Sequence, residues 1–299
     1  MPTQPALGLT SREGQPDLSD LAARLDEVAD LGLAFVELPA YHYDLVLAGR
    51  LMAARVAEFE AICRDRPFGF TVHGPLPINF MAPPALLPRF LETTEAFIEI
   101  AARIGAPHLV IHAGMMQADE RHDAENAAAR QRDYLRRAGD VAAAHDVVLC
   151  VENLFDFGPY AATPSIARLA EELALIDHPH VRATFDFSHG FIHASQHGYD
   201  FLEEAKALAP FARHLHLHDS FGQPDLPWVY DSAEANAFGL GDLHLPLGWG
   251  SLPWDALAEH CSFPANIIAI HELNERFWRD RQEALDNARG FLGLIHTAG

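Results

Sequence analysis

The sequence is poor in lysine and in cysteine. Lys206 is the only lysine among 299 residues, which nearly excludes catalysis through a lysine Schiff base. The cysteines, Cys63, Cys150 and Cys261, show no C-x-x-C spacing, so we expect neither a disulfide framework nor a zinc ribbon. This cysteine usage is typical of a reducing compartment, and we expect a cytoplasmic protein.

Positive charge and long apolar runs are also scarce. Lysine and arginine number 21 against 42 acidic residues, and the formal net charge is −21. A field of this sign repels phosphate backbones and anionic lipids, which argues against nucleic acid as a partner. No apolar run approaches the roughly 18 residues needed to span a bilayer. The N-terminus lacks a basic start followed by an apolar core, so we expect no export signal and no membrane partner.

Short apolar segments are abundant, and they follow a regular order. Hydrophobic residues make up 49% of the chain, as in an ordinary globular protein. Eight runs rich in Val, Ile, Leu and Phe alternate with longer stretches of helical periodicity, which indicates βαβ units. The predicted strands are residues 6–11, 34–40, 68–74, 108–114, 147–153, 181–187, 213–220 and 266–272. The pattern predicts an α/β fold, a single (β/α)8 TIM barrel that forms one domain over residues 1–299.

The segments between the strands predict the outer helices of this barrel. We expect helices to begin near Leu21, Leu51, Pro84, Ala124, Pro164, Asp200 and Pro253, and a last helix over residues 281–295. One connection, at about residues 219–252, is much longer than the others and contains several glycines, prolines and aromatic residues. Because a loop of that size in a compact domain is usually functional, we expect it to contribute to the active site.

Acidic and histidine side chains end seven of the predicted strands. In chain order they are Glu37, His73, His112, Glu152, Asp186, His216 and Glu272. Active-site groups of TIM barrels project from these strand ends, and alternation along the seventh strand puts His214, His216 and His218 on one face. A single polar strand end is more often structural than functional, but seven on one rim predict a site. Unpaired in an apolar barrel centre, such groups would each cost several kcal/mol, so we expect them to be solvated, paired or bound to metal.

Three further residues extend this set of candidate metal ligands. His189 follows Asp186 with D-x-x-H spacing, and Asp242 with His244 forms D-x-H in the long loop. Neither spacing is specific alone, because the chain has 18 histidines. Imidazole and carboxylate ligands without thiolate suit a divalent ion such as Zn, Mn, Mg, Co or Fe(II).

Several segments at the strand ends are specific only in combination: HGPLPINF, VIHAG, VENLF, FDFSHGFIHA, HLHLHDS, DLHLPLGWG and IHEL. Together they resemble the xylose-isomerase-like barrel superfamily, which includes sugar isomerases and epimerases and the endonuclease IV type of nuclease. The single metal site of the isomerases has matches at Glu152, Asp186, His216 and Glu272. The nucleases bind three zinc ions, and their additional ligands match His73, His112, His189, Asp242 and His244. The resemblance therefore leaves one to three metals open.

The resemblance implies a divalent-metal-dependent isomerase or epimerase of a sugar or sugar phosphate. Glu152 and Glu272 would be the carboxylate pair that moves a proton next to a metal-polarised carbonyl. The first alternative is a multinuclear zinc phosphoesterase like endonuclease IV, although the acidic charge argues against DNA. The second is a non-catalytic metal-binding barrel. We expect a small carbohydrate-like substrate, and the sequence also allows a homo-oligomer. The candidate substrate contacts are Glu37, Phe155, His218, Trp228, Trp249 and Arg276.

Overall fold

Eight parallel strands close into a barrel in the computed structural model, which describes residues 5–157, 161–226, 229 and 231–298. In chain order they are β1 (Ala6–Thr10), β2 (Phe35–Pro39), β5 (Gly69–His73), β6 (His108–His112), β8 (Val148–Glu152), β10 (Val181–Asp186), β11 (Ala212–Leu217) and β13 (Ile268–His271). Each strand pairs with the next, and β1 closes the ring against β13 in a register that aligns Ala6 with Ile268. The predicted TIM barrel is confirmed.

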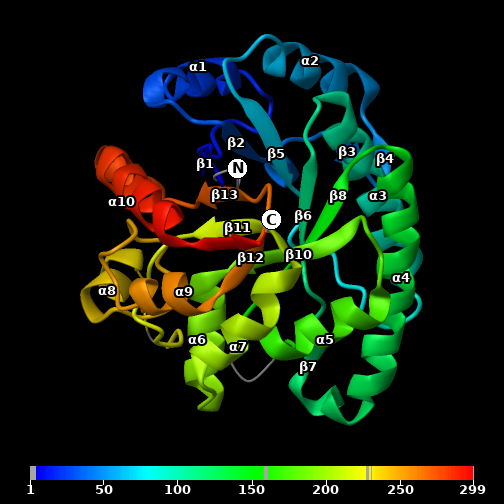
Figure 1. Ribbon diagram of the computed structural model, residues 1–299. Coiled ribbons are helices and arrows are strands. Elements are labelled where there is room, and N and C mark those ends of the chain that lie inside the picture. The colour runs from blue at the N-terminus through cyan, green and yellow to red at the C-terminus, as the bar shows by residue number, and fades with distance from the viewer. Residues whose placement is uncertain (1–4, 158–160, 227–228, 230, 299) are drawn as a thin grey trace.

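Helices cover the outside of the barrel (Figure 1). They are α1 (Leu21–Asp26), α2 (Ala53–Cys63), α3 (Leu87–Arg103), α4 (Ala124–Ala144), α5 (Ile166–Ile176), α6 (Phe187–His197), α7 (Phe201–Leu208), α8 (Ser232–Phe238), α9 (Trp254–His260) and α10 (Arg281–Leu294). Short 3₁₀ helices lie at Ala29–Leu31, Ala40–His42, Ala118–Asp123, Ala209–Phe211 and Glu275–Asp280. The remaining strands are β3 (Val46–Leu47), β4 (Arg50–Leu51), β7 (Met116–Gln117), β9 (Ala161–Ala162), β12 (Ser262–Pro264) and β14 (His296–Ala298). Within the described residues, no helix has the length and apolar character to cross a membrane.

The sequence pattern does not predict α6 or α8. Helix α6 begins directly after β10, with no turn residue between them, so periodicity gives no boundary. Asp186 ends β10 and also caps α6, because its side chain accepts a hydrogen bond from the backbone N–H of His189 at 2.7 Å. Helix α8 lies inside the long connection that we expected to be a loop.

Alternation along β11 separates the apolar core from the barrel interior. Leu215 and Leu217 belong to the apolar core. His214 and His216 occupy the alternate positions, are fully buried, and contact Glu37 of β2. Burying a leucine stabilises a fold by roughly 1.5–3 kcal/mol, and a one-residue slip would exchange the two faces. The leucines therefore set the register that directs these histidines inward.

Asp219 organises the long connection after β11. Its backbone pairs with Leu245, with N–H to oxygen distances of 3.0 and 3.1 Å in the two directions. Its carboxylate accepts hydrogen bonds from the backbone N–H of Gly248 at 2.9 Å and from the indole of Trp254 at 3.0 Å. These contacts hold Leu245 and Gly248 against the end of β11, so that Asp242 and His244 reach the strand ends.

Candidate metal centre at the barrel mouth

Three carboxylates surround one imidazole nitrogen at the carboxyl end of the barrel. Nδ1 of His216 lies 3.2 Å from Oε1 of Glu152, 3.2 Å from Oε2 of Glu272 and 3.7 Å from Oδ2 of Asp186. These residues come from the ends of β8, β10, β11 and β13, and the four candidate ligand atoms all lie within 4.8 Å of one another. One nitrogen and three oxygens form a donor set that suits a divalent ion.

Glu37 occupies the opposite side of the His216 ring. Its Oε1 accepts from Nε2 of His216 at 3.1 Å, while its Oε2 accepts from Thr71 at 3.0 Å and lies 3.0 Å from Nε2 of His214. Burial alone would raise the pKa of Glu37, but the two imidazoles hold it well below its usual value. The carboxylate is therefore charged, and it directs Nδ1 of His216 toward the other three carboxylates.

The environment of His216 fits a bound cation. Its Nδ1 is buried and has no hydrogen-bond partner among the described residues, although three carboxylates lie close to it. Burial lowers the pKa of this imidazole, but Glu272 and Glu152 raise it well above its usual value. Positive charge is thus favoured at this point. A histidine ligand whose second nitrogen donates to a carboxylate is the usual arrangement in metal sites.

A second group lies beside the first and consists of His189, His218, Asp242 and His244. Oδ2 of Asp242 is 2.7 Å from Nε2 of His244 and 3.0 Å from Nε2 of His189. The His218 ring stacks on the His244 ring at 3.9 Å, and its Nε2 lies 2.8 Å from Asp186. Burial lowers the pKa of His244, but Asp242 raises it to about 9. His244 is in the left-handed region, at φ 47°, and such strain is concentrated at functional sites.

Glu152 joins these groups to a third pair of histidines. Its Oε2 lies 3.2 Å from Nε2 of His73 and 3.7 Å from Nε2 of His112, while its Oε1 faces His216 and His189. Burial raises the pKa of Glu152, but His216, His189 and His73 hold it well below its usual value. The structure therefore brings all nine predicted ligand positions into one connected cluster, with Glu152 at its centre.

An open cavity of about 550 Å³ lies next to this cluster, and Glu272 and His244 form part of its wall. Arg12 and Tyr41 also line it, and the sequence analysis missed both. The Tyr41 ring packs edge-on against His73 at 5.6 Å. A signal was present, because Arg12 and Tyr41 follow the first and second strands closely, and residues after strand ends face the active site of a TIM barrel.

The predicted substrate contacts lie in different surroundings. His218 is fully buried within the cluster, and the buried Phe155 packs against the His189 ring at 5.2 Å. Trp249 donates from its indole to Glu283 of α10 at 2.9 Å and lies on the surface beside that helix. Arg276 is exposed in the 3₁₀ helix after β13. Trp228 lies outside the described residues.

Asn153 is a further residue that the sequence analysis missed. It is fully buried, and its amide pairs with the backbone of Asp186, donating to the carbonyl at 2.8 Å and accepting from the N–H at 2.9 Å. The backbone carbonyl oxygen of Asn153 lies 3.1 Å from Nδ1 of His189. Asn153 therefore ties the ends of β8 and β10 together, which holds Glu152 and Asp186 in a fixed relation.

Comparison with known proteins agrees with this architecture. The family described as xylose isomerase-like TIM barrel matches residues 25–288. A D-tagatose 3-epimerase-like protein superposes with a TM-score of 0.72 at 16% identity, covering 97% of this chain and 98% of that chain. The 3-keto-D-glucoside 4-epimerase YcjR from E. coli gives a TM-score of 0.63 at 16% identity, covering 96% of this chain and 100% of that one.

A third similar structure is the TTHB071 protein from Thermus thermophilus, solved after soaking with zinc chloride. Its TM-score is 0.67 at 22% identity, with 99% of this chain and 100% of that chain covered. At these identities the likeness shows a shared fold. No curated protein matches the sequence significantly.

Proposed function

Because the chain belongs to the xylose isomerase-like TIM barrel family, we propose that it is a divalent-metal-dependent sugar isomerase or epimerase. The observation that carries the proposal is the convergence of Glu152, Asp186 and Glu272 on the unpartnered Nδ1 of His216. These four residues would hold the ion. The family and this donor set support the same assignment.

Two carboxylates of this site are placed where they could move a proton on a bound sugar. When bound, a divalent ion polarises a substrate carbonyl and its neighbouring hydroxyl. Glu152 and Glu272 stand on β8 and directly after β13, on either side of β10 and β11 in the ring. One carboxylate would take a proton from the carbon next to the carbonyl, and the other would deliver a proton to the reacting carbon. The depressed pKa of Glu152 keeps its carboxylate ionised, which is the form that binds a cation.

Glu37 has a different role in this proposal from the one we expected. It is fully buried, and its oxygens are occupied by His216, His214 and Thr71. We therefore assign Glu37 to orienting His216 rather than to contacting substrate. The cavity beside Glu272 would receive the sugar, and its volume of about 550 Å³ lies in the range of small-molecule sites.

Solvent exchange tests the proposed proton transfer directly. The protein, loaded with Mn²⁺, Co²⁺ or Zn²⁺, is incubated with a panel of free and phosphorylated ketoses in D₂O. We expect deuterium to enter the substrate at the carbon next to the carbonyl, and Glu272→Gln to abolish this exchange. If no sugar of the panel exchanges or isomerises with any of the three metals, the isomerase assignment is wrong.

A zinc phosphoesterase is the second candidate, and the additional ligands favour it. His73, His112, His189, Asp242 and His244 lie in contact with the isomerase-type ligands, and clustered ions could clamp a phosphoryl oxygen and activate water. Hydrolysis of a model phosphodiester by protein carrying three zinc equivalents would establish this alternative.

We also propose that residues 1–299 form one domain and that the protein works in a reducing compartment such as the cytoplasm. The reducing compartment is supported by Cys63, Cys150 and Cys261, which are buried and unpaired. Limited proteolysis that releases no stable fragment would support the single domain.

A further inference from the structure

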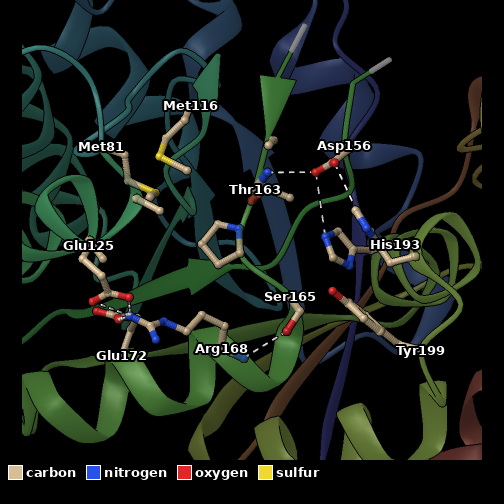
Figure 2. A pocket seen from close by; sticks show the side chains of 15 residues that line it. Met81, Met116, Glu125, Asp156, Thr163, Ser165, Arg168, Glu172, His193 and Tyr199 are labelled. Atoms are coloured by element: carbon tan, nitrogen blue, oxygen red, sulfur yellow. Dashed lines mark hydrogen bonds and ion pairs between the residues drawn. The ribbon is translucent and has the colours of Figure 1, made fainter. Parts of the chain in front are cut away.

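A separate group of histidine and aspartate side chains lies beside the barrel mouth, where α6 meets the loop after β8. It consists of Asp156 from that loop and of His193 and His197, which stand one turn apart on α6. Nε2 of His197 lies 3.1 Å from Oδ2 of Asp156, and Nε2 of His193 lies 3.8 Å from Oδ1. In Figure 2, Asp156 and His193 point toward each other at the edge of a pocket.

His193 is the residue whose surroundings point to a ligand. Its side chain is only 3% exposed, yet neither ring nitrogen has a hydrogen-bond partner among the described residues. A buried polar group without a partner destabilises a fold, so it needs a reason to be retained. Burial lowers the pKa of His193 and the neighbouring His197 lowers it further, against the raising effect of Asp156, so the net shift favours the neutral ring. Neutral imidazole is the form that coordinates a metal.

The carboxylate of this group is held in place before any ligand arrives. Gln196 of α6 accepts from the backbone N–H of Asp156 at 3.0 Å and donates to its carbonyl oxygen at 2.8 Å. The backbone N–H of Thr163 donates to Oδ1 of Asp156 at 2.9 Å. Gln196 and Thr163 therefore fix Asp156 against the helix. Metal-binding side chains are typically held by such hydrogen bonds from residues that do not themselves touch the metal.

We propose that Asp156, His193 and His197 form an additional binding site for a transition-metal dication such as Zn²⁺. One ligand atom from each of the three residues lies within 4.8 Å of the others, and each histidine faces one oxygen of the Asp156 carboxylate. Imidazoles at positions i and i+4 of a helix lie on one face, and two imidazoles with one carboxylate select such ions over Mg²⁺ or Ca²⁺.

Three protein ligands leave a coordination position open, and a pocket lies beside it. The pocket has a volume of about 280 Å³, and its wall includes Tyr199 and Thr163 (Figure 2). The Tyr199 ring stacks on His197 at 5.3 Å, so an aromatic face packs against one of the proposed ligands. Water or a small anionic ligand would complete the site, since zinc sites with three protein ligands bind such a group.

This ion would be distinct from those at the barrel mouth. His189, which belongs to the barrel cluster, precedes His193 by one turn on the same face of α6. At 1.5 Å per residue, His193 and His197 are displaced along the helix from His189 by about 6 and 12 Å. One ion cannot bridge such distances, because zinc–ligand bonds are about 2 Å long.

Counting zinc in matched variants tests the site. Purified protein is equilibrated with buffered free Zn²⁺, and bound zinc per chain is measured by mass spectrometry. We expect His197→Gln and Asp156→Asn each to lose about one equivalent relative to the unsubstituted protein. His178→Gln is the control, because His178 also pairs with an aspartate, at 3.4 Å from Asp140, without belonging to a group of three. It should lose none.

The count also separates this site from the barrel cluster. The loss caused by His197→Gln should be the same in the Glu152→Gln background as in the unsubstituted protein, since the two residues would serve different ions. An unchanged zinc count in His197→Gln would overturn the proposal. Should the variants fail to fold, anomalous diffraction at the zinc edge from crystals of the unsubstituted protein tests the site instead. A peak between Asp156, His193 and His197 is expected, and its absence from a zinc-saturated crystal would refute the site.

Discussion

Oε1 of Glu37 lies 3.1 Å from Nε2 of His216, and this contact turns the other ring nitrogen toward Glu152, Asp186 and Glu272. The two residues stand on β2 and β11, which are separated in the ring by β1 and β13. Closure of the barrel therefore creates the pair. In the proposed site, a buried carboxylate from one wall would orient a histidine on another wall to bind a cation.

Replacing Glu37 by glutamine should weaken metal binding without removing a ligand. The substituted side chain would no longer offer a charged acceptor to His216. We therefore expect metal affinity to fall roughly 10–100-fold, the range found when a residue that hydrogen-bonds to a metal ligand is replaced. Competition with a chelator measures it. Glu259→Gln, at a side chain that is 74% exposed, is the control and should leave affinity unchanged. Equal affinity in both variants would contradict the role of Glu37.

Neutralising Glu152 or Glu272 should affect turnover and metal content together. Glutamine keeps the volume but neither accepts a proton nor attracts the ion, so we expect kcat to fall by orders of magnitude and metal affinity by roughly 10–100-fold or more. Glu152→Gln should lose more metal, since that residue also contacts His73 and His189. Normal turnover and metal content in either variant would show the assignment to be wrong.

The metal count of the barrel cluster separates the two proposed chemistries. With one essential ion at His216, His244→Ala should leave the count at this cluster unchanged. With three ions, the cluster should carry more than two equivalents and His244→Ala should lose about one. We expect the lower count, because the net charge of −21 disfavours the nucleic acid that a trinuclear site would serve. Measurements are made in the His197→Gln background so that the site on α6 does not contribute.

The N-terminus of α7 offers a stability test away from the metals. Asp200 accepts hydrogen bonds from the backbone N–H of Leu202 at 3.0 Å and of Glu203 at 3.2 Å. Asp200→Ala should lower the free energy of unfolding by about 1 kcal/mol, because these donors lose their acceptor. Asparagine caps helices about as well as aspartate, so Asp200→Asn should be nearly neutral. Urea denaturation compares the variants, and an equal loss in both would argue against capping.

The thiols should resist alkylation in the native protein. Burial raises the pKa of Cys63 to about 12 and the pKa of Cys261 to about 11, and burial also raises the pKa of Cys150. Since the thiolate is the reactive form, we expect no labelling of the folded protein by iodoacetamide near neutral pH. Labelling should begin only when the pH approaches these raised pKa values. In guanidinium chloride all three cysteines should react. Rapid labelling of the folded protein would contradict the burial.

The sequence alone determined the strands, because alternating apolar residues and strand ends are local features. Seven of the eight predicted runs contain a barrel strand, and the run at 213–220 overlaps β11, which begins one residue earlier at Ala212. Glu152, Asp186 and His216 could be placed at the mouth because strand ends meet there in a TIM barrel. The boundary between β10 and α6 could not be found, since Asp186 serves both elements and no turn residue marks the change.

Tertiary structure decided which side chains meet. The partner of Glu37 is His216, 179 positions away in the chain, and no local pattern specifies such a pair. The surroundings of Trp249 depend on α10, and those of His193 depend on a loop from the neighbouring strand. Backbone periodicity sets the direction of a side chain within its own element, whereas its contacts follow from how the elements close around the barrel.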